Sequence, residues 1–385
     1  MSARPEVAVV GAGIHPFGRH EGVTGLAMGA YAVRAALADA GVAWADVQFA
    51  YGGSEDAGNA DTMVAELGPT GLPFVNVKNG CATGGSSLVS AVRALESGAF
   101  ELGVVVGFDK HPRGAFRTDP ADWSLPAWYG EDGLMVTTQF FGAKVQRYMH
   151  DHGIPELTLA QVAEKAFRNG SMTPHAWRRT PLSLEEILEA PIVAHPLTKY
   201  MLCSPGEGAA ALVLCRREAL VRLPRARPIW LRSVAFRTRR PNSFEVFSPS
   251  VALEVAPSPT VDAAREAFEH AGLGPADVDV VQVQDTESGA ELIHLAECGL
   301  CEHGAQVELY ASGATNRDGR LPVNTDGGCL ANGEPVGASG LRQVFEVVVQ
   351  LRGEAGQRQV PNGPRVGFTH VYGAPGVSAC TVLSR

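Results

Sequence analysis

Short apolar runs alternate along this chain with longer segments of helical periodicity. Runs rich in valine and alanine predict buried strands at residues 6–11, 47–51, 103–107 and 209–215. Alanine and leucine recur at helical spacing over residues 26–40, and Gly41 fits the position that ends a helix. We expect the strand at residues 6–11 to be a buried parallel strand. The alternation of strands and helices predicts an α/β protein.

Aromatic and polar residues break this rhythm between about residues 110 and 200. The stretch begins with several prolines and with Trp123, Trp128 and Tyr129, and amphipathic helices are predicted at 136–152 and 159–169. Long excursions of this kind either cover a pocket or make subunit contacts. We expect it to run over one face of the molecule.

An internal repeat relates the two parts of the chain. Tyr31–Val47 aligns with Asp262–Val278, because alanine, arginine, glycine, aspartate and valine recur in register and each segment leads into a predicted strand. Further along, Asn79-Gly-Cys81 is echoed by Gly327-Gly-Cys329. The repeat predicts two similar α/β halves, and equivalent turns of the two halves meet near their interface, where sites commonly form.

We place the halves at residues 1–225 and 226–385, with the excursion in the first half. The boundary lies inside an arginine-dense segment, 216–240, which Pro224 and Pro228 interrupt. This segment is either a solvated connector or a patch that meets anionic phosphates. A run of charges is usually a solvated face, which favours the connector.

Length and charge narrow the class of protein. A chain of 385 residues exceeds one simple core, in agreement with two halves. The formal net charge of −9 argues against a nucleic-acid-binding body. Seven cysteines without framework spacing, and an N-terminus unlike a signal peptide, predict free thiols and a cytoplasmic setting. No apolar run approaches the roughly 20 residues that span a bilayer, so no membrane association is predicted.

Two short motifs could carry chemistry but are weak. Gly11-Ala-Gly13 begins like a dinucleotide-binding fingerprint, yet Pro16 stands where the third glycine belongs. Cys298 and Cys301, with His303 nearby, have the spacing of half a zinc site, and a second pair is lacking. We predict no resident metal.

The most informative stretch surrounds Cys81. A predicted strand at residues 73–77 leads to Cys81, which glycine and other small residues flank, and a helix is predicted at 87–95. Free backbone N–H groups and the helix dipole stabilise a thiolate at a helix N-terminus. The alternative is a buried structural cysteine in a tight turn.

Five motifs in order resemble those of the thiolase superfamily, especially its lipid-transfer-protein (sterol-carrier) branch, and they extend over nearly the whole chain. They are the turn Asn79–Ser87, the segment Cys203–Leu214, the pair Gln284-Asp285, the loop Pro322–Gly340 and the loop His370–Gly376.

The resemblance implies a duplicated thiolase fold, with five αβαβα layers in two similar halves that each hold a mixed sheet. It also implies a homodimer, and a coenzyme A thioester as substrate without a covalently bound cofactor. Some relatives of this branch work with a small zinc-ribbon/OB-fold subunit, which makes such a partner a further expectation. In this scheme Cys81 carries the acyl group, because a thiolate both attacks and leaves readily.

The chain departs from the family pattern around the cysteine. Glu334 stands where the family has the histidine of Gly-His-Pro, and Gln284 replaces another histidine. We therefore predict Glu334 and His370 as bases, with Tyr372 as an acid. The resemblance assigns oxyanion and substrate binding to five further residues: Gln284, Asp285, Gly337, Ser339 and Gly373.

Three functions stay open at this point. The first is a thiolase that cleaves or forms a C–C bond in a β-ketoacyl-CoA, with an aromatic or branched acyl group as one option, through acyl-Cys81. The second is a retro-aldolase of the steroid side-chain type, which acts on a β-hydroxyacyl-CoA without an acyl-enzyme. The third is a non-catalytic thiolase-like subunit.

Overall fold

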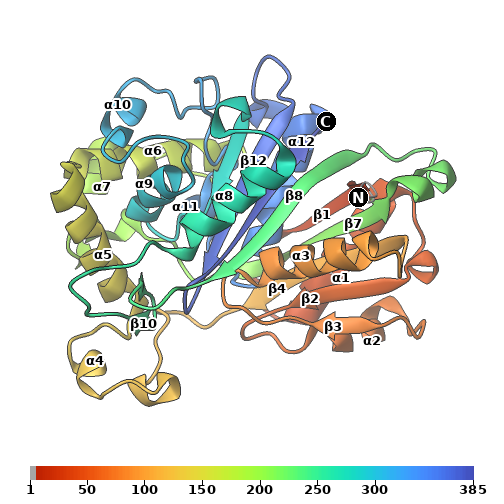
Figure 1. Ribbon diagram of the computed structural model, residues 1–385, viewed down its shortest axis with the longest axis horizontal. Helices are drawn as coiled ribbons and strands as arrows, with labels where there is room; N and C mark the ends of the chain where they lie inside the picture. The colour runs from red at the N-terminus through yellow and green to blue at the C-terminus, as the bar shows by residue number, and fades with distance from the viewer. Residues whose placement is uncertain (1–5) are drawn as a thin grey trace.

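The computed structural model describes residues 6–385 (Figure 1). Its strands are β1 (Val7–Gly18), β2 (Phe49–Gly53), β3 (Phe74–Asn76), β4 (Leu102–Lys110), β5 (Ile192–Ala194), β6 (Leu197–Thr198), β7 (Glu207–Arg216), β8 (Ile229–Thr238), β9 (Phe244–Glu245), β10 (Ser248–Pro249), β11 (Val280–Val283), β12 (Val366–Gly373) and β13 (Val377–Ser384).

The α-helices are α1 (Gly25–Ala40), α2 (Val64–Leu67), α3 (Thr83–Glu96), α4 (Trp128–Glu131), α5 (Thr137–His152), α6 (Glu156–Ser171), α7 (Leu184–Leu188), α8 (Pro259–Ala271), α9 (Ser288–Glu297), α10 (Gln306–Ala311), α11 (Gly328–Asn332) and α12 (Ser339–Arg352). Short 3-10 turns connect several of them. Among residues 6–385, no helix is both long and apolar enough to cross a membrane.

Nine strands form one mixed sheet in the order β11-β12-β13-β8-β1-β7-β4-β2-β3. The predicted two sheets are two strand groups, β3-β2-β4-β7-β1 and β11-β12-β13-β8. A short antiparallel pairing of β1 with β8, over three residue pairs, joins the groups. Each group is mixed, since β2–β3, β2–β4 and β11–β12 are parallel and the other neighbours are antiparallel.

Helices and strand groups alternate in five layers. Helices α3 and α12 contact each other and strands of both groups, so they form the central layer. Helix α1 packs on β1, β4 and β7, and α8 packs on β8, β12 and β13. Three apolar clusters fill the spaces around these layers, and the central one joins Leu88 and Leu95 of α3 to Leu341 and Val348 of α12. This arrangement is the predicted αβαβα architecture.

The internal repeat is visible in the backbone. Helices α1 and α8 both end at a left-handed glycine, Gly41 and Gly272, and each is followed by a 3-10 turn and a strand. The prediction for the first strand was wrong in one respect. β1 is antiparallel to both of its neighbours, because β7 and β8 run in the opposite direction, and it extends through the glycine pair to Gly18. The division near residue 225 stays a prediction.

The excursion packs on the other half of the chain. Helices α5 and α6 contact α9, and α6 also contacts α10 and α11, which lie together at the left of Figure 1. Lys165 of α6 forms a buried ion pair with Glu291 of α9, and Tyr310 and Asn324 also donate hydrogen bonds to Glu291. Burial lowers the pKa of Lys165, although Glu291 acts in the opposite direction.

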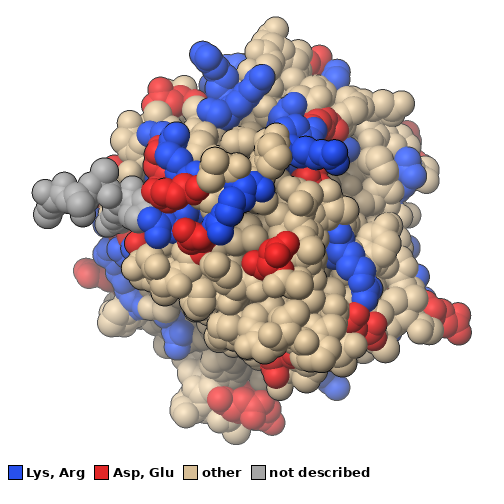
Figure 2. Space-filling view, turned by 90° about the vertical axis from the view of Figure 1, so that its right-hand side faces the viewer, with Lys and Arg blue, Asp and Glu red and all other residues tan. Residues whose placement is uncertain are grey.

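The arginine-dense segment is largely paired with acids. Ion pairs join Arg216 to Glu218, Arg217 to Glu6, Arg222 to Glu101, and Arg227 to Asp39 and Glu354. On the face seen in Figure 2, basic and acidic side chains are interspersed. Exposed pairs of this kind contribute little to stability. They favour a solvated connector over a phosphate-binding patch.

Candidate active site

Cys81 lies two residues before the first residue of α3 and is only partly buried. The turn is closed by hydrogen bonds from the Ala82 and Thr83 N–H groups to the Asn79 and Gly80 carbonyls, at 3.1 and 2.9 Å. Gly80 has a φ of +53°, and a Cβ there would lie 2.8 Å from the Ala374 carbonyl oxygen. Only glycine fits this position, which brings the last loop of the chain against the cysteine turn.

The Glu334 carboxylate stands next to the Cys81 thiol. The Gln284 amide donates to its Oε1 atom and the Ser339 hydroxyl donates to its Oε2 atom, both at 2.9 Å. The Glu334 side chain is buried, and its backbone is paired with Ser204 and Gly206. The second half of the chain thus holds a carboxylate in one orientation against the cysteine of the first half. Gln284 Oε1 is buried without a hydrogen-bond partner.

This environment keeps the thiol protonated. Burial raises the pKa of Cys81 well above the ordinary cysteine value, and the negative charge and hydrogen bonding of Glu334 raise it further. A thiolate therefore forms here only if its proton is taken up nearby. Glu334 is placed to take it.

Two other cysteines border the same carboxylate. Burial raises the pKa of Cys203 and of Cys329, and Glu334 and Asp285 add to each shift. The Cys203 N–H donates to the Thr286 carbonyl at 2.9 Å. The sequence did not predict a role for Cys203. Its signal in the sequence was its place at the start of the Cys203–Leu214 motif.

Asp285 stabilises the turn at Cys329, the counterpart of the Cys81 turn in the repeat, and not the Cys81 turn itself. Its carboxylate accepts hydrogen bonds from the Cys329 and Leu330 N–H groups, at 2.7 and 3.4 Å. Burial, followed by the charge of Glu291, raises the pKa of Asp285 well above its usual range. Asp285 is fully buried, and its predicted role in substrate binding stays a prediction.

His370 and Tyr372 face away from the Cys81 turn. The His370 ring shares a 3.0 Å hydrogen bond with Thr260, and the Tyr372 hydroxyl donates to Glu245 at 2.5 Å. Between them, Val371 packs with Ala82 beside the cysteine. Successive side chains of a strand point to opposite faces, so both polar residues lie on the α8 side of β12. Burial lowers the pKa of His370 far below its ordinary value, with His294 and Lys144 adding to the effect.

The predicted glycines do lie at the site. A Cβ on Gly373 would lie 2.5 Å from the Ala82 backbone nitrogen, so Gly373 packs directly on the turn. Gly337 packs between β2 and β4, where a Cβ would lie 2.5 Å from both the Gly53 and the Phe108 carbonyl oxygens. The structure therefore brings Cys81, Glu334, Gln284 and Ser339 together, and it places Gly337 and Gly373 beside them. Their roles stay predictions.

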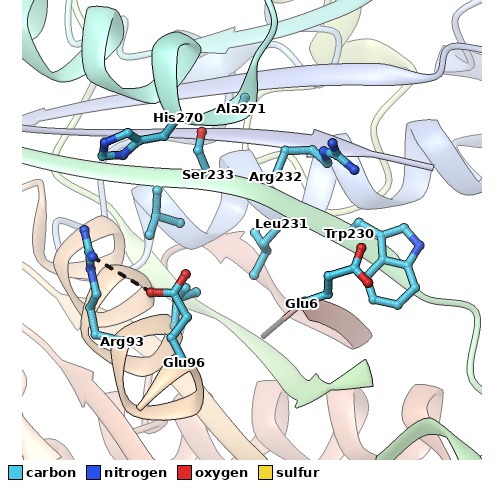
Figure 3. A pocket seen from close by; sticks show the side chains of 11 residues that line it. Glu6, Arg93, Glu96, Trp230, Leu231, Arg232, Ser233, His270 and Ala271 are labelled. Atoms are coloured by element: carbon cyan, nitrogen blue, oxygen red, sulfur yellow. Dashed lines mark ion pairs between the residues drawn. The ribbon is translucent and has the colours of Figure 1, made fainter. Parts of the chain in front are cut away.

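The cavity drawn in Figure 3 lies elsewhere. It has a volume of about 210 Å³ and is lined by the ends of α3 and α8 and by the first half of β8. Arg93 and Glu96 form a 3.8 Å ion pair on one wall. None of the residues named above for the site lines this cavity.

The cysteines and the half zinc motif have ordinary surroundings. All seven cysteines, which lie within residues 6–385, are free. His303 Nδ1 is hydrogen-bonded to the Tyr148 hydroxyl at 2.8 Å. Within the part of the chain that the structure describes, no three His, Cys, Asp or Glu side chains are grouped to hold a metal ion.

Comparisons with known proteins agree with this architecture. A family model described as the thiolase N-terminal domain matches residues 7–218, and one described as thiolase C-terminal domain-like matches residues 249–385. A benzoylsuccinyl-CoA thiolase subunit from Thauera aromatica is 31% identical over 388 residues, covering 97% of this chain and 96% of the relative. Sterol carrier protein 2 from Oryctolagus cuniculus is 31% identical over 400 residues, covering 99% of this chain and 72% of the relative.

A solved structure titled as an Ltp2-ChsH2(DUF35) aldolase has the same fold. Its TM-score is 0.87 and its sequence identity is 24%, with 99% of this chain and 98% of that chain covered. At this identity the likeness concerns the fold alone.

Proposed function

Because the chain belongs to the thiolase family, we propose that it is an acyl-CoA enzyme that cleaves or forms the C–C bond of a β-ketoacyl-CoA through a thioester on Cys81. The observation that carries the proposal is the Cys81 thiol beside the Glu334 carboxylate, whose two oxygens Gln284 and Ser339 hold. A nucleophile next to an oriented base is the arrangement that covalent acyl transfer requires.

In the cleavage direction, Glu334 takes the thiol proton while the Cys81 sulfur attacks the ketone carbon of the substrate. The bond between the α- and β-carbons breaks, and its electron pair remains on the α-carbon of the leaving thioester as an enolate. Glu334 returns the proton to that carbon. The α-carbon thus receives both the electron pair of the broken C–C bond and the proton that came from the thiol.

The second half-reaction restores the enzyme. The thiol of coenzyme A gives its proton to Glu334 and attacks the acyl carbon. The bond from that carbon to the Cys81 sulfur breaks, and Glu334 returns the proton to the sulfur. Glu334 thus carries the proton that a histidine carries in other members of the family.

Aromatic side chains that pack in one cluster with Ala374 of the last loop support a bulky or aromatic acyl group. The rings of Trp123 and Phe247 stack at a centroid distance of 6.4 Å, and Phe247 and Phe244 pack in one cluster with Ala374. Ala374 touches the Cys81 turn through Gly80. Partly exposed rings near the loop that packs on the Cys81 turn fit an aromatic or branched acyl group, and the relative from Thauera is named for a benzoylsuccinyl thioester.

The experiment that tests the proposal is mass spectrometry after incubation with a panel of β-ketoacyl-CoA thioesters. Wild type should gain the acyl mass on the peptide that contains Cys81, and Cys81→Ser should lose at least about 10³-fold in turnover because the covalent route is removed. Cys215→Ser is the matched control, since Cys215 is buried in β7 away from the turn. Full C–C cleavage by Cys81→Ser would overturn the proposal.

One observation favours the retro-aldolase as a second candidate. The Cys81 pKa is raised rather than lowered, and a retro-aldol reaction needs a base such as Glu334 but no thiolate. Cleavage of β-hydroxyacyl-CoA thioesters by Cys81→Ser would support this candidate. Absence of both reactions with every thioester would support the non-catalytic subunit.

We also propose a homodimer and a separate small partner subunit. Strand β3 is the outer edge of the sheet, and its Val75 side chain is 45% exposed, so the edge is open to pairing with a second copy. A relative is named as a thiolase subunit, and the aldolase structure has a second component in its title. Light scattering gives the test: the mass should be twice 40.6 kDa, and Val75→Lys should halve it.

A further inference from the structure

Two side chains at the C-terminal end of β4 fix the loop that carries Glu334. Asp109 is near the end of β4 and His111 comes directly after that strand. The Asp109 carboxylate accepts the Gly337 N–H at 2.8 Å, and His111 Nε2 lies 3.1 Å from the Val336 backbone nitrogen. Both side chains are completely buried. Neither belongs to the motifs that led to the proposed function.

Asp109 is the rigid part of this anchor. Besides Gly337, it accepts the N–H groups of Glu55 and Asp56 at 2.8 and 2.9 Å. Although burial acts to raise the pKa of Asp109, the neighbouring His111 ring and those backbone N–H groups lower it below the usual range. An ionised Asp109 thus ties the loop after β2 to the loop that carries Glu334.

The His111 ring has an orientation set by its partners. The Val336 N–H can only donate, so Nε2 must accept, and the proton of the neutral ring is then on Nδ1. Nδ1 lies 2.6 Å from Asp56 Oδ2, which accepts that proton in a hydrogen bond. A ring with protons on both nitrogens could not accept the Val336 N–H. It would turn its second proton to Asp109 Oδ2, which is 3.4 Å from Nε2.

We propose that His111 is a positioning residue: its ring, oriented by Asp56, holds the Val336 backbone and so keeps the Glu334 carboxylate beside Cys81. The inference rests on the proposed function, in which Glu334 is the base. Val336 is two residues from Glu334, and Ser339 at the other end of the loop is bonded to the same carboxylate. Release of Val336 would therefore loosen both the base and one of its two donors.

The charged groups around the His111 ring make its hydrogen bond with the Val336 N–H depend on pH. Asp109 from β4 and Asp56 from the loop after β2 face its nitrogens, and the Arg19 guanidinium donates to the His111 carbonyl. Burial acts to lower the pKa of His111, but Asp109 and Asp56 outweigh it and raise the pKa. Val336 is held by the neutral ring, so its bond is made above the His111 pKa and is lost as the pH falls through it.

Alkylation of Cys81 by iodoacetamide, followed by peptide mass spectrometry as a function of pH, tests the positioning role without any turnover. His111→Ala should free the loop, and as Glu334 moves away the apparent pKa of Cys81 should fall by about one pH unit, with alkylation at pH 8 about tenfold faster. His111→Gln should stay close to wild type, because its amide oxygen can accept the Val336 N–H. His150→Gln, at an exposed site on α5, is the matched control.

Asp56→Ala provides a second variant, since the Asp56 side chain is 43% exposed and its loss should leave the fold intact. It should shift the Cys81 profile in the same direction by a smaller amount. Unchanged profiles in His111→Ala and Asp56→Ala, or equal shifts in His111→Ala and His111→Gln, would overturn the proposal. If Cys81 never becomes acylated while the alkylation profile still depends on His111, the proposed function fails and the anchor stands.

Discussion

The turns that contain Cys81 and Cys329 are copies of one another in the two halves, and their sulfur atoms have different surroundings. Cys81 precedes the long helix α3 and remains partly accessible. Cys329 lies inside the short helix α11 and is fully buried, with its N–H bonded to Asp285 and its sulfur 3.7 Å from the Arg342 guanidinium. Arg342 is itself held in a buried ion pair with Asp326.

The difference lies in a five-residue segment that begins two residues after Cys329. Ala331–Pro335 has no counterpart after Cys81, and it carries Glu334 across to the first half. The duplication kept both turns, and the insertion in the second copy supplies the partner for the cysteine in the first. The candidate site is therefore complete only when both halves are present.

Among the substitutions that test this difference between the Cys81 and Cys329 turns, Glu334→Gln should have the largest effect. Turnover should fall by about 10²-fold if Glu334 is the base. Alkylation of Cys81 at neutral pH should become faster, because a neutral amide no longer raises the Cys81 pKa. Steady-state kinetics and iodoacetamide labelling measure the two effects on the same sample.

The control for this variant is Glu254→Gln, which changes an exposed glutamate between β10 and α8. It should leave both measurements unchanged. Turnover close to wild type in Glu334→Gln would remove this residue from the mechanism. Slower alkylation would show that the carboxylate does not raise the pKa of the thiol.

A smaller effect is expected from Cys329→Ala. Turnover should stay within about threefold of wild type, while the free energy of unfolding falls by about 1 kcal/mol as a small buried side chain is lost. Urea unfolding monitored by circular dichroism measures the second quantity. Loss of turnover comparable to that of Cys81→Ser would mean that the buried turn takes part in the chemistry.

The sequence predicted the backbone of this site better than its side-chain directions. The repeat indicated two similar halves, and the resemblance to the thiolase superfamily implied the five layers. The structure brings Cys81, Gln284, Glu334 and Ser339 together across the two halves. The directions of the His370 and Tyr372 side chains could not be predicted from the sequence. Strand β12 is buried on both faces, so its sequence lacks the alternation of polar and apolar residues that would indicate which side chains face α3.

Other features depended on contacts between distant segments. The antiparallel direction of β1 follows from the courses of β7 and β8, about 200 residues away, and a valine-rich run does not encode it. His111 and Asp109 had a weaker signal, since both are polar residues at the end of a buried strand. Their partners Val336 and Gly337 are more than 220 residues later, so only the fold brings them together.

The crossing of the excursion onto the second half has a consequence for biosynthesis. Helix α6 packs on α9, α10 and α11, and Lys165 has its carboxylate partner in Glu291. While the ribosome is still translating the residues before α9, α7 can pack on α6, but the part of α6 that packs on α9, α10 and α11 is uncovered and Lys165 lacks Glu291. The first half therefore emerges as an incomplete folding unit, whose exposed apolar surface favours aggregation until the second half is made.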